Sequence, residues 1–413
     1  AGALGMTLGK AALTLAEVSG DLAVRSQVTL FAYLYLLHGE VHTAALTAAF
    51  DSAYRLGLES GDVSRISESA MTLCLARLMA GDELGALQAE MARHADQVAR
   101  LQQTMTRTYL QIYQQAVHNL REGAQEPGAL AGPFFDEATR MPELVATQDM
   151  GGLFNIHCAK ILLCCLFGEG QKAQETALAA AAYGAVAAGS ATAAPFDFYC
   201  ALGGLLGAQP ARGRGDEAGR AALSAAIATA EEVERRLQGM RGSAHRALLL
   251  RAERLRLTGD EAAAREGYAQ AVAAAQESAV APELALCSER AGHFLLHSGR
   301  PRLAQPHLRQ AHAVAVRWGA LALARALEQR YPSLLPRVAL STLGTSMVNA
   351  TQTGERALGT LELIGLLDAS QALSREIRLD RLLAQLMALL LATSGAERGF
   401  LLLDANHGEG ESG

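Results

Sequence analysis

Four side chains with metal-binding chemistry lie close together in the sequence: His157, Cys158, Cys164 and Cys165. Imidazole and thiolate groups are the ligands that zinc prefers in proteins. On a helix Cys158 and Cys165 share one face, but intervening positions such as Ile161–Leu162 are apolar and typical of a core. We therefore expect buried structural thiols and predict no metal site.

Two glycine-rich stretches have part of the pattern of a nucleotide-binding loop. A phosphate-binding loop needs glycines, a Lys and a Ser or Thr at fixed spacing, so that backbone N–H groups surround the phosphates. Gly5–Ala11 is one residue short and lacks the hydroxyl, and Gly213–Gly219 has an extra residue before its third glycine and no preceding strand. We interpret both as chance matches and predict no cofactor.

The remaining candidates favour structural roles. Glu231, Glu232 and Glu234 are interpreted as a solvated helix face, and the single Trp318 as a core residue at the end of an amphipathic helix. The sequence has no HExxH pair, nucleophile elbow, kinase loop or phosphoacceptor histidine box. We predict no catalytic residue and no enzymatic activity for this segment.

The composition favours helices. Of 413 residues 50% are hydrophobic, 19% charged and 5% aromatic, and much of the apolar fraction is alanine, the strongest helix former. A net charge of -6 and a pI near 6.0 do not indicate a nucleic-acid partner. Six irregularly spaced cysteines are typical of reduced thiols in a cytoplasmic protein.

No segment indicates membrane insertion or secretion. The longest uncharged run, Thr176–Phe196, is rich in Ala, Gly and Ser and too weakly hydrophobic for a membrane span, so we expect a packed helix and loop. The first charged residue is Lys10, and no basic region precedes an apolar core. We also expect both ends of this sequence to be internal positions of a longer protein.

A helix–glycine–helix pattern recurs at an interval of forty residues. Gly259 aligns with Gly299, and in the helices that follow Tyr268 aligns with Leu308 and Ala271 with Ala311. Residues three or four apart lie on one helical face, which predicts a packing stripe on each second helix.

Three earlier turns, at Gly39, Gly81 and Gly168, have the same arrangement. A glycine ends a helix without the steric penalty of a Cβ, and an acidic residue usually follows near the positive end of the next helix. The hairpin resembles the TPR motif in a long form of about 40 residues. The predicted fold is all-α, a TPR-like solenoid of helical hairpins.

Prolines, glycines and polar runs divide the chain. We predict a first block of hairpins at 1–125, a second helical block at 126–210 and C-terminal hairpins at 211–335. A linker at 336–357 leads to a helix and a strand-like run at 358–413.

Several stretches carry a family resemblance: Gly57–Asp62, Tyr113–Val117, Phe196–Tyr199, Arg317–Ala320 and Leu327–Pro332. They resemble the central region of very large bacterial signalling proteins. These proteins combine a serine/threonine kinase, an AAA-type ATPase module, a long TPR-like region, a GAF domain and often a histidine kinase.

The end of the chain is the most diagnostic part. Leu367–Ser374, Leu379–Leu383 and Gly395–Asp404 are similar to the linker helix, first helix and first strand of a GAF domain. The chain departs from the family in being richer in Ala and Arg. It also lacks the kinase, the ATPase and nearly all of the GAF fold, so the signalling activity that the resemblance implies belongs to the parent protein.

Stacked hairpins form a superhelix whose concave surface binds peptides or domains. We therefore expect a scaffold that relays signals between an ATPase or kinase module and a GAF domain. Its partners are expected to be a protein or peptide on the concave face or the parent's own kinase and ATPase domains. Leu366, Leu373 and Ile377 recur at helical spacing and are candidates for a parallel homodimer seam; packing of this helix on its own GAF domain is the equal alternative.

A second function class is the ligand-sensing solenoid of an ATP-dependent transcription regulator, which places similar repeats between an ATPase and a DNA-binding domain. The GAF-like start at Ala396–Asp404 argues against it. A helix-turn-helix after Gly413 would favour it.

Overall fold

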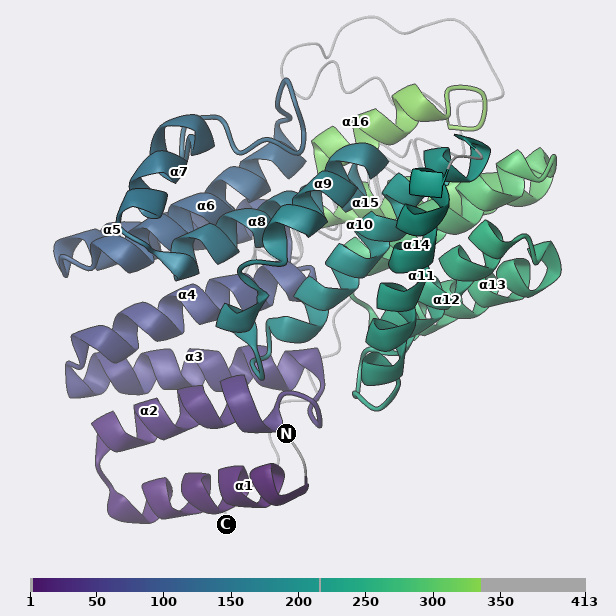
Figure 1. Cartoon of the computed structure of the whole chain (residues 1–413). Coiled ribbons are helices and arrows are strands. Elements are labelled where there is room, and N and C mark those ends of the chain that lie inside the picture. Colours follow the sequence, from purple (N-terminus) through teal and green to yellow (C-terminus); the bar gives the residue numbers. More distant parts are fainter. Residues whose placement is uncertain (1–2, 215–216, 336–413) are drawn as a thin grey trace, which may run out of the picture. The chain divides into compact units, whose positions relative to one another are not determined.

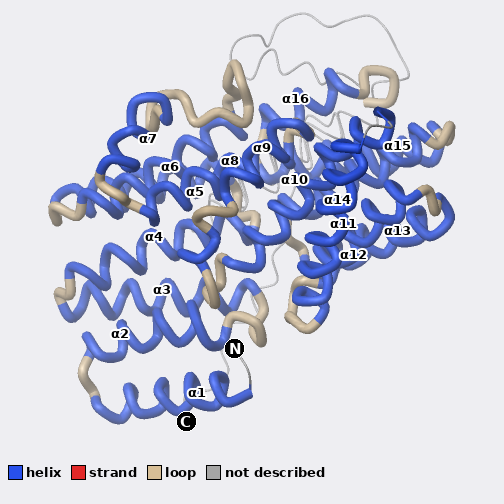
Figure 2. The backbone as a smooth tube through the Cα atoms, viewed as in Figure 1, coloured by secondary structure: helices blue, strands red, loops and turns tan. Residues whose placement is uncertain are grey.

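The computed structural model describes residues 3–214 and 217–335, and all regular elements in these ranges are helices (Figure 2). The only pairing of strand type within them is an isolated bridge between Ala131 and Asp136. The all-α prediction is therefore confirmed. The predicted linker, the C-terminal helix and the GAF-like strand lie outside the described residues.

The described helices follow one another as antiparallel pairs, which form a solenoid (Figure 1). Their bounds are α1 Ala3–Ser19, α2 Leu22–Phe31, η1 Ala32–Leu37, α3 Thr43–Ser60, α4 Val63–Ala80, α5 Leu84–Arg100, α6 Thr104–Arg121, α7 Glu137–Ala146, α8 Met150–Leu166, α9 Gly170–Ala180, η2 Gly184–Ala187, α10 Ala193–Arg214, α11 Glu217–Gln238, α12 Ala244–Thr258, α13 Glu261–Ser278, α14 Ala281–His297, α15 Pro301–Trp318 and α16 Leu321–Arg330. η1 is a π-helix and η2 a 3₁₀-helix.

In several Gly-Asp pairs of the turns, the glycine ends one helix and the aspartate begins the next. At Gly259-Asp260 the glycine has φ 94° and ends α12, and the Asp260 carboxylate accepts the Ala263 N–H at 3.0 Å to begin α13. Gly61-Asp62 does the same between α3 and α4. A left-handed glycine satisfies the last carbonyls of one helix, and an N-cap satisfies the first N–H groups of the next. A two-residue turn therefore suffices.

The predicted turn glycines lie in these connections. Gly81, Gly168, Gly259 and Gly299 have positive φ values, between 67° and 94°. Gly39 also lies in a turn, but its φ is not positive. The segment before it is the π-helix η1, and the Glu40 N–H donates to the Leu37 carbonyl at 3.0 Å, a closure that needs no left-handed residue.

The predicted packing residues are buried. Tyr268, Ala271, Leu308, Ala311 and Trp318 are each at most 2% exposed. They belong to one hydrophobic core that extends from Cys74 to Leu335 and crosses the predicted boundaries at 125/126 and 210/211. By contacts the chain forms one unit from Ala1 to Val338 and another from Ala339 to Gly413; only the first is described here.

The later helices of the array pack back against helices of its first half. Helix contacts lead from α4 through α6, α8, α10 and α12 to α14, and α14 then contacts both α4 and α8. Near this junction a Cβ on Gly81 would lie 2.6 Å from the Ala281 backbone nitrogen. Helices α8 and α14 are buried on nearly all sides, so side chains fill the space between these inner helices.

Replacing Gly81 by alanine should destabilise the protein more than the same change at Gly299. Both residues have positive φ, which costs a residue with a Cβ about 1–2 kcal/mol. At Gly299 nothing lies within 4 Å of the added Cβ, whereas at Gly81 it meets the backbone of α14, which adds about 1–3 kcal/mol. Urea unfolding measures both variants. Equal losses would mean that α4 and α14 are not in contact in solution.

Candidate functional site: a buried ion-pair network on α14

The His and Cys residues considered as metal ligands are packed inside α8. Cys158 and Cys165 are buried, and burial raises the pKa of both thiols, that of Cys158 to about 12. His157 stacks on Tyr183 at 5.1 Å between ring centroids, and burial lowers its pKa to about 4. A thiol that stays protonated is a poor nucleophile and ligand. Within the described ranges no three His, Cys, Asp or Glu residues are grouped to hold a metal ion.

Helix α14 carries charged side chains into the interior. It contacts α4, α8, α12, α13 and α15, which leaves it almost no face toward water. Glu283, Glu289 and Arg290 are therefore 1–5% exposed. An isolated charge in such a position costs several kcal/mol, so each of these groups needs a partner of opposite charge.

The first cluster joins α12 to the beginning of α14. Glu283 accepts a hydrogen bond from Arg246 Nε at 2.8 Å and contacts His245 Nε2. His245 Nδ1 lies 3.1 Å from the Ser278 hydroxyl of α13. Burial alone would raise the pKa of Glu283, but Arg246 and His245 lower it to about 2. The ionised carboxylate thus joins α14 to α12, and His245 extends the contact to α13.

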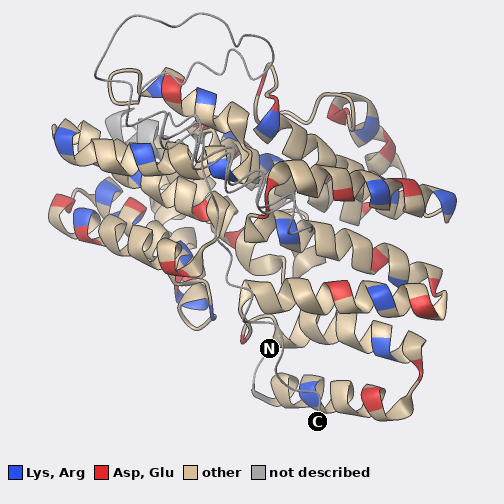
Figure 3. Ribbon diagram, turned by 180° about the vertical axis from the view of Figure 1, so that it is seen from behind, with Lys and Arg blue, Asp and Glu red and all other residues tan. Residues whose placement is uncertain are grey.

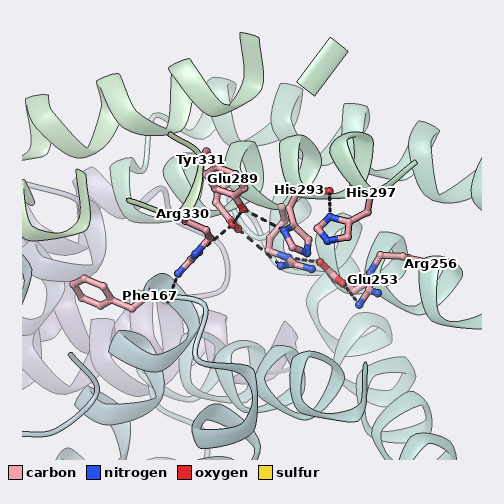
Figure 4. Close-up of polar contacts among 9 residues, drawn as sticks. Phe167, Glu253, Arg256, Glu289, His293, His297, Arg330 and Tyr331 are labelled. Atoms are coloured by element: carbon pink, nitrogen blue, oxygen red, sulfur yellow. Dashed lines mark hydrogen bonds and ion pairs between the residues drawn. The ribbon is translucent and has the colours of Figure 1, made fainter. Parts of the chain in front are cut away.

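The second cluster joins α12 to the middle of α14 (Figure 4). The Glu253 side chain is fully buried and accepts hydrogen bonds from Arg290 Nε at 2.6 Å and from Arg256 Nε at 2.8 Å. Burial opposes ionisation, yet the two guanidinium groups lower the pKa of Glu253 to about 2. Glu253 is therefore a carboxylate at all physiological pH values.

The third cluster holds the end of α16. Glu289 accepts hydrogen bonds from the Tyr331 hydroxyl and from Arg330 Nη1, the latter at 3.1 Å, while Arg330 Nη2 donates to the Phe167 carbonyl (Figure 4). A Cβ at Gly168 would lie 2.6 Å from the Arg330 guanidinium, so the glycine in this turn also makes room for the arginine. The end of α16 is thereby joined to α14 and to the end of α8.

His293 borders the third cluster. Its Nδ1 lies 3.2 Å from the Tyr331 hydroxyl, and its ring lies 4.1 Å from that of His297 between centroids, tilted by 42° (Figure 4). Burial, followed by the charge of Arg290, lowers the pKa of His293 to about 4. The imidazole is therefore neutral at pH 7.

The network has the properties of a structural lock. Glu253 and Glu283 have a pKa far below neutrality, which makes them poor general acids, and neither side chain is reached by solvent. Every carboxylate already accepts from two side chains. The arrangement therefore joins α8, α12, α14 and α16 through carboxylates that are buried and already paired.

The sequence pattern does not reveal this network, and the predicted solvent exposure of one acidic residue is wrong. Glu234 is 7% exposed and pairs with Arg254 at 2.8 Å, so its interpretation as part of a solvated face is wrong; Glu231 and Glu232 are exposed. The signal for the network is the run 284–296, in which Glu289 and Arg290 interrupt an otherwise mostly apolar helix. A helix without a polar face must bury whatever charge it carries.

No protein-family model and no curated protein matches this chain. The resemblance to bacterial signalling proteins therefore stays a prediction from the residues that carry it. The candidate dimer residues Leu366, Leu373 and Ile377 lie outside the described part of the chain.

Replacing Glu253 by glutamine should cost about 3–5 kcal/mol of unfolding free energy, because Arg290 and Arg256 would keep their charge and lose the buried carboxylate that both of them contact. Glu232→Gln is the matched control: Glu232 pairs with Arg235 at the surface, where such a pair contributes at most about 1 kcal/mol. Denaturant unfolding at pH 7 gives both values. A loss below 1 kcal/mol for both variants would contradict the lock.

Acid should destabilise the fold in two stages. His293 and His157 have a pKa of about 4 in the folded protein, against an ordinary 6.5. Their contribution to the free energy of unfolding is therefore complete above pH 6.5 and is lost as the pH falls toward 4. Glu253 and Glu283 have a pKa of about 2 in the folded protein, against an ordinary 4.5. Their contribution to the free energy of unfolding is therefore lost between pH 4.5 and 2. In thermal melts His293→Gln should flatten the upper stage only. An unchanged slope between pH 6.5 and 4 would exclude His293 as a contributor.

Proposed function

We propose that this segment is a non-catalytic protein-interaction and signal-relay scaffold of a large bacterial signalling kinase. It couples an ATPase or kinase module to a GAF sensory domain in the cytoplasm. The observation that carries the proposal is the attachment of α16, the last described helix, to helices far earlier in the sequence. A relay needs this kind of connection, because a rigid path transmits a displacement that a flexible chain would absorb.

The attachment of α16 has two points. Near its middle, Arg325 Nη2 donates to the Glu122 carbonyl at 2.7 Å, at the end of α6. At its end, Arg330 donates to the Phe167 carbonyl after α8 and to Glu289 of α14. Both contacts use carbonyls at helix C-termini, where a cation also complements the helix dipole. The direction in which the chain leaves α16 thus depends on α6, α8 and α14 together.

The surface favours protein partners. Lys and Arg are interspersed with Asp and Glu along many of the described helices, whereas α15 carries arginines and no acidic residue (Figure 3). No helix in the described ranges is both long and apolar enough to cross a bilayer. Because side chains fill the space around α8 and α14, contact with the parent's own kinase and ATPase domains is better supported than a peptide along the inner face. A homodimer through the C-terminal helix remains part of the proposal.

A ligand-sensing solenoid of an ATP-dependent transcription regulator is the second candidate. It is favoured by a pocket where the N-terminal hairpins meet α10–α12. The coding sequence on both sides of this segment separates the two functions. Kinase and ATPase motifs upstream with a GAF domain downstream support the relay, and a DNA-binding helix pair downstream supports the regulator.

In the full-length parent protein, Arg330→Met should weaken the dependence of phosphorylation on the input signal while leaving basal phosphorylation in place. The substitution removes the contacts with Phe167 and Glu289 but touches no catalytic group. Phosphate incorporation with and without the signal measures the effect, and Glu232→Gln at the exposed surface is the control. An unchanged response in Arg330→Met, with α16 shown by hydrogen exchange to be released, would refute the relay.

A further inference from the structure

A pocket lies at the seam between the first hairpins and the second half of the array, and we call it the seam pocket. It is bounded by η1, α3 and α4 on one side and by the beginning of α10 and the α11–α12 turn on the other. Two backbone hydrogen bonds hold this seam: Ala191 N–H donates to the Leu34 carbonyl at 2.7 Å, and Arg241 N–H to the Gly39 carbonyl at 3.0 Å. Segments about 150 to 200 residues apart in sequence thus form one site.

The inner wall of the pocket is apolar. It is formed by the side chains of Leu46, Phe50, Leu75, Ala76 and Met79 from α3 and α4. The cavity volume is about 80 Å³. This is about half of the ~150 Å³ of an apolar cavity that takes up benzene, so the inner cavity is too small for a ring and holds only part of a narrower alkyl chain.

The charged groups of the seam pocket are all cationic. Arg246 lines it from α12 and Arg241 from the turn before α12, and its lining contains no Asp or Glu. Burial lowers the pKa of His38, which adds a neutral imidazole to the wall. Thr43, Thr72, Thr192 and Ser243 are the other polar residues of its lining. An apolar pocket with a few convergent polar groups is the usual form of a small-molecule site, and arginine is the residue best suited to bind a carboxylate.

A wider outer cavity gives access to the seam pocket. It has a volume of about 310 Å³ and shares His38, Ala194 and Met240 with the inner one. Its acidic groups are the exposed Glu40 and the half-buried Asp197, which pairs with Arg236 at 2.9 Å. A molecule longer than the inner cavity can therefore extend into the outer one.

We propose that the seam pocket binds a slender amphipathic monocarboxylate, a straight-chain fatty acid of medium length. Its alkyl chain lies against Phe50, Leu75 and Met79, and its carboxylate lies at the guanidinium groups of Arg246 and Arg241. This site does not depend on the relay function; it adds a ligand to whatever partner the array has.

The position of Arg246 connects such a ligand to the ion-pair network. Arg246 Nε donates to Glu283, the carboxylate that joins α12 to α14. A ligand carboxylate at the same guanidinium would share this cation and alter its pairing with Glu283. Occupancy of the seam pocket is thus linked to the helix pair that also holds α16.

Isothermal titration calorimetry of the whole chain with octanoate tests the proposal. Octan-1-ol, which has the chain without the charge, and benzoate, which has the charge on a ring, are the comparison compounds. We expect saturable binding of octanoate, at least tenfold weaker binding of octanol and no binding of benzoate. No heat from octanoate up to millimolar concentration, or equal affinity for octanoate and octanol, would overturn the proposal.

Two variants locate the site without disturbing the buried pair of Arg246. Ala76→Leu on α4 fills the inner cavity and should abolish octanoate binding, and Ala273→Leu on the exposed face of α13 is the matched control. Arg241→Gln removes the exposed cation and should weaken binding several-fold, and less so at high salt. Octanoate affinity that Ala76→Leu leaves unchanged would place binding elsewhere on the protein and refute the seam pocket.

Discussion

The pairing of three buried carboxylates is the constraint on which this structure depends. Glu253, Glu283 and Glu289 lie in the interior, where an ionised group without a partner costs several kcal/mol. Their partners come from α12, from α14 itself and from the end of α16. Glu253 and Glu283 are therefore satisfied only when α12 and α14 are packed together, and Glu289 only when the end of α16 is also in place. Such a network selects one arrangement of helices more strongly than it adds to stability, since an apolar core of the same volume would avoid the cost of burying charge.

The same constraint separates this array from an open solenoid. In an open solenoid each repeat contacts only its neighbours, and stability is a sum of local terms. Here α14 contacts α4, and the α4–α5 turn approaches α14 so closely that Gly81 has no room for a Cβ. Arg330, at the end of α16, donates a hydrogen bond to the carbonyl of Phe167. Closure of this kind makes residues far apart in sequence depend on one another, which is what both a relay and a site built from distant segments require.

The repeat could be predicted from sequence because its signals are local. A glycine followed by an aspartate ends one helix and begins the next within two residues, and the stripe of Tyr268 and Ala271 shows which face is buried. The closure could not be predicted, since the contacts of Gly81 with α14 and of Arg330 with Phe167 join positions about 160 to 200 residues apart. The burial of Glu234 has a more local cause that the sequence pattern also does not reveal, since periodicity does not show that Arg254 of the next helix lies against it. The backbone conformation at Gly39 also differs from that of the other turn glycines, because the π-helix before it closes the turn without a left-handed residue.

Native-state hydrogen exchange of the whole chain, followed through increasing denaturant below the unfolding transition, tests the central claim most directly. If the ion-pair network holds the array as one unit, the slowest amides of α4, α8, α12 and α14 should converge on one opening free energy with one denaturant dependence. If the hairpins of α12–α15 open separately, with a smaller free energy and a shallower dependence than α4–α8, the array is an ordinary chain of neighbours and the account is contradicted.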